Sequence, residues 1–323
     1  MTAATSSNRI QRYLARRFVT LLSQDPTGVP PWLPIVARGD EPGLFLPDDA
    51  PWVVHADFAT FVGGVRALLI QALHPGSLAG VREHSRYQAD PVGRLAGTIR
   101  WLTITTFGSV EAVQAEAGRV NRLHQRVTGE YRTARGETPR YAASDPDLLL
   151  WVHIAFTESF LRAHQNYSRR PIPGGADAYV RLWAKSVEPL GLHHVPLSEA
   201  ALRAEIQRFK ETGELAANAD TAEVVRFLRR PPLGFGVHVV YAALFRAAVA
   251  TIPREFLDLL GLKPQPLWLW RPVVRSLLIL MRWAVGPDSP VEEAARDRLA
   301  RAKRIDPPTG APIGSLPPGG PDR

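Results

Sequence analysis

Paired helix start and stop signals punctuate this 323-residue chain, and they restrict its fold more than any other feature. Asp90-Pro91 and Asp145-Pro146 each place a capping carboxylate before a proline at the first helical position. Gly108 ends the first of these helices, and Ser109 caps another that is expected to run to Gly129. No segment shows the sustained alternation of apolar and polar residues that is typical of a strand. The sequence therefore predicts an all-α protein.

We expect about ten helices in a single globular domain. One follows Asp57 and runs to about Leu73, where His74-Pro75-Gly76 stops it. Asp220 with Glu223 resembles a capping box at the start of a later helix. Besides the helix over 91–107, others are expected at 146–167, 175–188, 198–211, 221–229, 236–251, 272–284 and 290–304. Residues 1–50 are interpreted as an N-terminal helix and lead-in, 51–305 as the domain, and 306–323 as a Pro/Gly-rich disordered tail.

The net charge and the N-terminal sequence exclude some classes of binding partner and leave others open. The net charge of +8 permits attraction to nucleic acid, anionic lipid or acidic ligands, but no nucleic-acid module accompanies it. The first twenty residues lack the continuous apolar core of a secretory signal, so we expect a cytoplasmic protein. The run RIQRYLARRF is interpreted as a docked terminal helix or a lipid-binding one.

The most apolar stretch runs from Leu267 to Val285. Arg271, Arg275 and Arg282 interrupt it, and each charge at the centre of a membrane span costs about 2.5–3.5 kcal/mol. The stretch therefore predicts a buried or surface-lying helix rather than a membrane crossing, and it leaves peripheral membrane contact open.

The chain has no cysteine, which excludes disulfides, iron–sulfur clusters, thiolate-ligated haem, covalent c-type haem and cysteine zinc sites. Any metal must be held by His, carboxylate, Tyr or Met. The sequence contains no Glu-x-x-His, no His-Glu-x-x-His and no His-x-x-x-His. Metal sites that take two ligands from one face of a helix are therefore excluded as well.

Three histidines stand out. His124 is expected to share a helix face with Val120, Leu123 and Val127, so its imidazole points to the interior as a core histidine or as an axial haem ligand. His153 lies on an apolar helix, and a buried ring there needs a partner, which is a metal, a haem-pocket group or another side chain. His74 either caps helix carbonyls or faces the pocket.

Arg94, Thr98, Trp101 and Thr105 form one stripe of the helix over 91–107, at i, i+4, i+7 and i+11. An arginine, a hydroxyl and an indole on one line suit a pocket wall that binds a carboxylate or orients dioxygen. A solvated arginine above a packed tryptophan is the alternative.

Three segments together carry a resemblance to a known family: LHPGSLAGVREHSRYQADPVGRLAGTIRWLTITTFGS, AGRVNRLHQRVTGEY and DPDLLLWVHIAFTES. Between about Pro51 and Leu192 the chain resembles the catalytic domain shared by MpaB-type oxygenases and the latex-clearing rubber oxygenases. The ordered combination of His-Pro, Asp-Pro-x-x-Arg-x-x-x-Thr, Val-x-x-x-His-x-x-Val and Trp-Val-His is specific. The resemblance implies a non-covalent haem b with His124 as its proximal ligand and with Arg94 and Thr98 lining the pocket.

The resemblance also has departures. Rubber oxygenases of this type carry a lysine immediately before the threonine, whereas this chain has Gly97, so an axial lysine from that position is impossible. Arg119, Arg122 and Arg126 reproduce only part of the arginine-rich surroundings of the proximal histidine. The resemblance therefore does not define the group on the distal side of the haem, and it does not imply a rubber-like substrate.

From these residues we expect a haem pocket between the helices over 91–107 and 110–128, in an oxygenase that uses dioxygen or peroxide on an apolar, isoprenoid-type substrate. Arg94 would pair with a propionate or polarise oxygen, Thr98 and His153 would lie near the distal face, and Trp101 and His74 would line the cofactor site. A non-catalytic haem sensor or carrier, or a membrane-peripheral helical binding protein, remains as the alternative.

Overall fold

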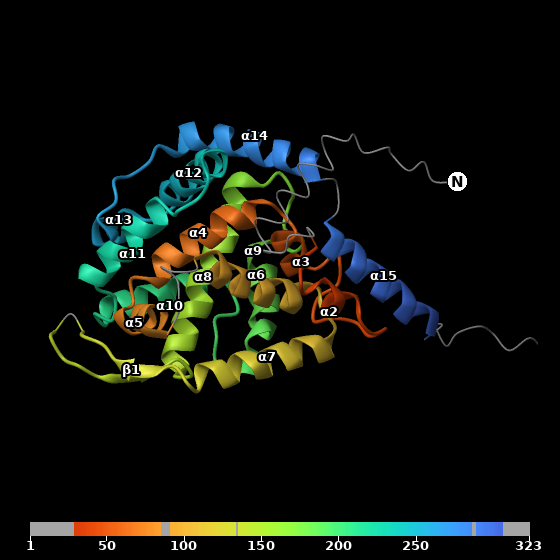
Figure 1. The fold of residues 1–323 in the computed structure, drawn as a ribbon, viewed down its shortest axis with the longest axis horizontal. Coiled ribbons are helices and arrows are strands. Elements are labelled where there is room, and N and C mark those ends of the chain that lie inside the picture. Colours follow the sequence, from red (N-terminus) through yellow and green to blue (C-terminus); the bar gives the residue numbers. More distant parts are fainter. Residues whose placement is uncertain (1–28, 85–90, 134, 286–288, 306–323) are drawn as a thin grey trace, which may run out of the picture.

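The computed structural model describes residues 29–84, 91–133, 135–285 and 289–305, and it confirms the all-α prediction (Figure 1). The described residues form fourteen α-helices, more than the ten expected. In chain order they are α2 (Leu33–Ala37), α3 (Ala50–His55), α4 (Ala59–Gln71), α5 (Pro75–His84), α6 (Pro91–Phe107), α7 (Val110–His124), α8 (Pro146–Tyr167), α9 (Gly175–Trp183), α10 (Glu199–Glu211), α11 (Ala219–Arg229), α12 (Phe235–Ala250), α13 (Arg254–Leu260), α14 (Leu267–Val285) and α15 (Pro290–Ile305).

The helices that the sequence did not predict, α2, α3, α5 and α13, have ten residues or fewer. Helices this short show too few turns for a period of 3.6 residues to stand out. Two 3-10 helices, η1 (Ala184–Ser186) and η2 (Glu188–Leu190), follow α9. The expected N-terminal helix within 1–28 and the expected tail over 306–323 lie outside the described residues, and the domain division stays a prediction.

The core is built around the pair α4 and α8, which pack along each other in the middle of the molecule (Figure 1). Their close approach depends on Gly63 of α4, because a Cβ built there would lie 2.7 Å from Cδ1 and 3.0 Å from Cα of Phe160. Trp151 of α8 is fully buried, and its indole N–H donates to the backbone oxygen of Gln71 at 3.2 Å. The close approach at Gly63 and this hydrogen bond both hold α8 against α4.

A second apolar cluster joins the two ends of the described chain to α6. Trp52 and Phe107 meet edge to face with ring centroids 4.8 Å apart, and α15 packs on α2 beside them. The fully buried Arg298 of α15 donates to the backbone oxygens of Val36 at 2.6 Å and Phe107 at 2.8 Å. A cation at the carboxyl end of α6 also complements the helix dipole, so α15 stabilises the end of that helix.

Helix α7 is shorter than predicted, and this changes the surroundings of His124. It ends at His124 instead of Gly129, and the chain continues into β1 (Thr128–Glu130), which pairs antiparallel with β2 (Arg140–Ala142). Val127 and Tyr141 pack on α5 beside Gly80, where a Cβ would lie 3.6 Å and 3.4 Å from them. This tertiary packing outweighs the helical pattern of the sequence.

Two predicted caps are also corrected. The capping box of α11 is formed by Asn218 and Thr221, whereas Asp220 and Glu223 turn to Arg82 of α5, with Asp220 at 2.6 Å. Asp145 precedes α8 as predicted, but its carboxylate accepts the backbone N–H of Ala142 at 2.7 Å and caps the loop instead of the helix.

Helix α14 begins at Leu267, five residues before the predicted start, and continues through Pro272. It lies on the surface, as predicted, with one face in the core. Among the helices of the described residues, none combines the length and low charge that a membrane crossing requires. The cytoplasmic location stays a prediction.

Candidate active site

Three of the four residues of the predicted stripe on α6 have described side chains, and their burial increases toward the carboxyl end of the helix. Thr98 and Trp101 are half-buried, and Thr105 is fully buried. The hydroxyl of Thr105 has no hydrogen-bond partner in the described part of the chain. Arg94 lies on the first turns of α6, and its side chain is outside the described residues. The expectation that Arg94 lines a pocket therefore stays a prediction.

His124 occupies the last position of α7, and its side chain is half-buried. The predicted interior face around it is wrong in part, because Leu123 is 50% exposed and Val127 lies beyond the helix. The helix end places His124 where the chain turns toward β1. An imidazole there lies at the edge of the core, within reach of both the interior and the surface.

An ion-pair cluster joins the helix of Thr98 to the helix of His124. Arg100 of α6 donates from Nε to Oε1 of Glu116 at 3.0 Å and from Nη2 to Oε2 at 2.8 Å. Arg119, one turn along α7, donates to the same carboxylate at 2.6 Å. Burial alone would raise the pKa of Glu116, but the hydrogen bonds and charges of Arg119 and Arg100 outweigh burial and lower it. Glu116 thus stays ionised, and α6 and α7 are clamped together.

His153 lies on α8 and is 6% exposed, which confirms the predicted burial. Burial lowers the pKa of its imidazole from 6.5 to about 4. The ring is therefore neutral near pH 7, with one nitrogen that donates and one that accepts. Such a ring suits either a ligand or a hydrogen-bonding group, as the sequence left open.

His74 caps a helix, as one of its two predicted roles required, but it caps the amino end of a helix instead of the expected carboxyl end. Its Nδ1 accepts the backbone N–H groups of Gly76 at 3.1 Å and Ser77 at 3.4 Å, so it caps the amino end of α5. Its Nε2 lies 3.8 Å from Oε2 of Glu214. Burial lowers the pKa of His74 more than the Glu214 charge raises it. The rings of Tyr131, Trp151 and Phe209 lie around it.

The predicted site residues thus fall into three places. Thr98, Trp101 and Arg94 share α6, which packs on the helix of His124. His153 lies in the central helix α8, and His74 lies at the start of α5 near β1. Among the described residues, no three His, Asp or Glu side chains gather as a metal-binding cluster. The structure thus places Thr98 and Trp101 on a helix that packs against the helix of His124, whereas His153 and His74 lie on other elements.

A comparison with protein families decides the relationship of the chain. The model of the catalytic domain of ER-bound oxygenase mpaB/B′ and rubber oxygenase matches residues 52–285. The chain belongs to this family. The match runs from α3 to the end of α14 and so includes α6, α7 and α8. No curated protein matches the chain, and neither does any solved structure.

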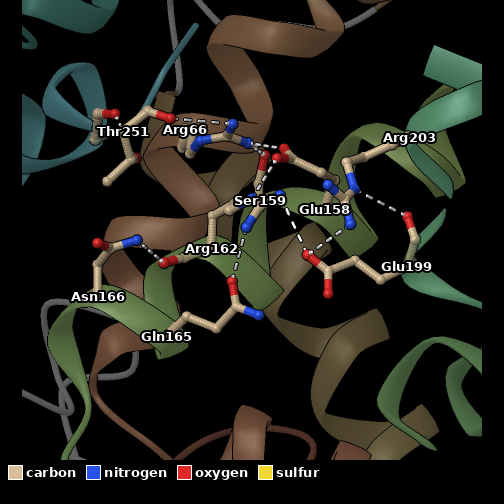
Figure 2. Close-up of polar contacts among 10 residues, drawn as sticks. Arg66, Glu158, Ser159, Arg162, Gln165, Asn166, Glu199, Arg203 and Thr251 are labelled. Carbon is tan, nitrogen blue, oxygen red and sulfur yellow. Dashed lines mark hydrogen bonds and ion pairs between the residues drawn. The ribbon is translucent and has the colours of Figure 1, made fainter. Parts of the chain in front are cut away.

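In this member of the mpaB/rubber oxygenase family, a buried ion pair lies in the core, and the sequence analysis missed it. Arg66 of α4 is 1% exposed and donates to the carboxylate of Glu158 and, at 2.8 Å, to the hydroxyl of Ser159 (Figure 2). From Glu158 the network continues to Arg162 at 3.1 Å and on to Glu199 at 3.2 Å (Figure 2). The signal was present, since Arg66 is the single charge of α4 and Glu158 lies within the apolar α8, and charges buried in apolar helices are expected to pair.

A buried histidine on α3 was missed as well. His55 lies among Phe160, Tyr179 and Trp183, and its Nε2 is 3.3 Å from the hydroxyl of Tyr179. Burial, with a smaller contribution from the charge of His164, lowers its pKa to about 3. In this family member His55 is therefore a neutral core residue. Its position after an apolar PWVV run was the available signal.

Proposed function

We propose that this family member is a haem b-dependent oxygenase that acts on an apolar, isoprenoid-type substrate, with His124 as the protein ligand of the iron. The observation that carries the proposal is the clamp that holds the helix of His124 against the helix of Thr98 and Trp101, inside a family-matched oxygenase domain. A haem iron takes four ligands from its porphyrin, so one histidine suffices and no cluster of side chains is required.

The residues of α6 fit such a group. The buried Thr105 hydroxyl lacks a partner among the described residues, and an unpaired buried hydroxyl costs about 1–3 kcal/mol that a new hydrogen bond would recover. A Cβ built on Gly97 meets no atom of the described residues within 4 Å. Space beside Gly97 and an apolar Trp101 favour a flat apolar group along this helix. When bound, the haem would supply the oxygen-activating chemistry.

Each predicted side chain would then have its own role at the haem. Thr98 and the neutral ring of His153 would donate or accept hydrogen bonds near the reacting oxygen. Arg94 would pair with a propionate, because a guanidinium binds a carboxylate with two parallel hydrogen bonds. His74 would line the site through Nε2 alone, since its Nδ1 is engaged by the amino end of α5.

Oxygen consumption tests this function against the non-catalytic alternatives. Protein expressed with added haem should consume oxygen faster when an isoprenoid alkene is supplied in detergent than with detergent alone. Haem-loaded protein with no alkene-dependent consumption would instead be a haem sensor or carrier. Protein that takes up no haem would be a helical binding protein that uses the fold without the cofactor.

A further inference from the structure

Helix α14 exposes an apolar stripe to solvent, and no function proposed above uses it. Trp268 is 79% exposed, Leu280 58% and Trp283 53%. We call this set the α14 stripe; its members are Trp268, Leu269, Val273, Ile279, Leu280 and Trp283. Large apolar side chains exposed together are rare on monomers and mark interaction sites.

The members of the α14 stripe share one side of the helix. Their spacings follow a period of 3.6 residues, and from Trp268 to Trp283 the stripe extends about 22 Å at 1.5 Å per residue. The opposite side of α14 holds Val274 and Leu278, which are buried in the main core. Figure 1 shows α14 along the outer edge of the molecule, on the far side of α12 from α4. The stripe therefore faces away from the body of the protein.

The charges beside the α14 stripe are positive. Helix α14 contains three arginines and no aspartate or glutamate. Arg271 and Arg275 both donate from Nε to the backbone oxygen of Asn166 at 3.1 Å. A backbone oxygen carries no net charge, so these bonds hold the guanidinium groups in place without neutralising them. Burial and the charges of Arg271 and Arg169 lower the pKa of Arg275, which shows how closely the cations gather.

We propose that α14 docks this protein on the surface of an anionic lipid bilayer. The apolar stripe would lie at the boundary of headgroups and acyl chains, and Arg271 and Arg275 would bind lipid phosphates. Tryptophans at both ends of the stripe suit this depth, because an indole prefers the membrane interface. The proposal does not depend on the haem.

The positive charge of α14 favours a lipid bilayer over two other molecules or segments that could cover the α14 stripe. A second copy that met the first through α14 would bring Arg271 and Arg275 of the two copies together, and their like charges would repel. The chain's own N-terminal residues include Arg9, Arg12, Arg16 and Arg17 within their apolar pattern, so they too would repel the arginines of α14. An anionic bilayer supplies both the apolar layer and the opposite charge.

Vesicle co-sedimentation of the full chain tests the proposal. The wild type should bind vesicles made of equal parts phosphatidylcholine and phosphatidylglycerol, and should bind phosphatidylcholine vesicles much less. The double variant Trp268→Ser/Leu280→Ser should lose about tenfold or more in partition coefficient. Arg271→Glu should weaken binding only to the anionic vesicles. The matched control is Leu197→Ser, which removes an apolar side chain of similar exposure, 55%, far along the chain from α14 and should bind like the wild type.

Each remaining outcome overturns the proposal. Equal binding of vesicles by the double variant and the wild type would show that the α14 stripe is not the lipid-binding surface. A loss of binding in Arg12→Gln/Arg16→Gln with normal binding by the double variant would assign it to the N-terminal residues. Absent vesicle binding together with a dimer that the double variant abolishes would make the α14 stripe an interface between copies.

Discussion

Arg100 and Glu116 form a two-pronged ion pair between α6 and α7, with Nε to Oε1 at 3.0 Å and Nη2 to Oε2 at 2.8 Å. Glu116 is 3% exposed, so the pair lies inside the helix interface. A third partner, Arg119, stabilises the same carboxylate from within α7. The relative position of Thr98 and His124 depends on this contact, because each residue lies on one of the two joined helices.

We predict that Glu116→Gln weakens the clamp. The amide carries no charge and leaves two partly exposed arginines facing each other, so the free energy of unfolding should fall by about 1–3 kcal/mol in urea titrations. The variant should also retain less haem than the wild type. Glu111→Gln, which changes an exposed carboxylate on the first turn of α7, is the control and should lower stability only by the about 0.3–1 kcal/mol of a charge at a helix dipole, with haem content unchanged. Wild-type stability in Glu116→Gln would show that α6 and α7 are held by apolar packing alone.

Gly63→Ala and Gly64→Ala should have opposite effects. The Cβ at residue 63 would meet the backbone of Phe160 at 3.0 Å and of Ser159 at 3.2 Å, so α4 and α8 must separate, at a cost of about 1–3 kcal/mol. The Cβ at residue 64 meets nothing within 4 Å, and alanine there should raise helix stability by about 0.5–1 kcal/mol. Thermal unfolding of both variants checks this. Equal shifts of the two melting temperatures would contradict the close packing of α4 and α8.

Replacing one partner of the buried pair of Arg66 and Glu158 should strongly lower the free energy of unfolding. Glu158→Gln leaves the guanidinium of Arg66 without a counter-charge, and we expect a loss of about 3–5 kcal/mol. Replacing both residues by methionine should recover most of that loss. Glu199→Gln, at the half-buried end of the same network near the surface, should cost less, about 1 kcal/mol. A Glu158→Gln effect as small as that of Glu199→Gln would refute the buried network.

Stability should fall as the pH is lowered from about 7 to about 5. His55 and His153 have pKa values of about 3 and 4 in the folded chain, below the 6.5 of the unfolded chain. The unfolded state therefore binds more protons in this window, and each histidine should remove about 2 kcal/mol of stability by pH 5. His55→Phe should have a shallower pH dependence than the wild type. An identical dependence would mean that His55 takes up a proton in the folded state.

Local signals predicted the helices that carry the candidate site. Asp90-Pro91 and Gly108 placed α6 at the observed residues, and Pro146 placed the start of α8, because caps and prolines act on their own neighbours. The end of α7 could not be predicted this way. It depends on Val127 and Tyr141 packing against α5, a contact between residues far apart in the sequence.

The candidate site shows the same limit. The pattern on α7 placed His124 deeper than the structure does, because periodicity cannot tell where a helix leaves the core. Arg66 and Glu158 are 92 residues apart, and a single sequence marks each as an anomaly in an apolar helix without naming its partner. The ligand role of His124 stays a prediction for experiment.

The most direct test of that role is the absorption spectrum of protein expressed with added haem, compared between the wild type and His124→Ala. The wild type should show a Soret band, and His124→Ala should lose it or shift it strongly, while the exposed-surface control His194→Ala keeps the wild-type spectrum. Identical haem content and spectra in the wild type and His124→Ala would contradict the assignment, and loss of the band in His153→Ala alone would transfer it to His153.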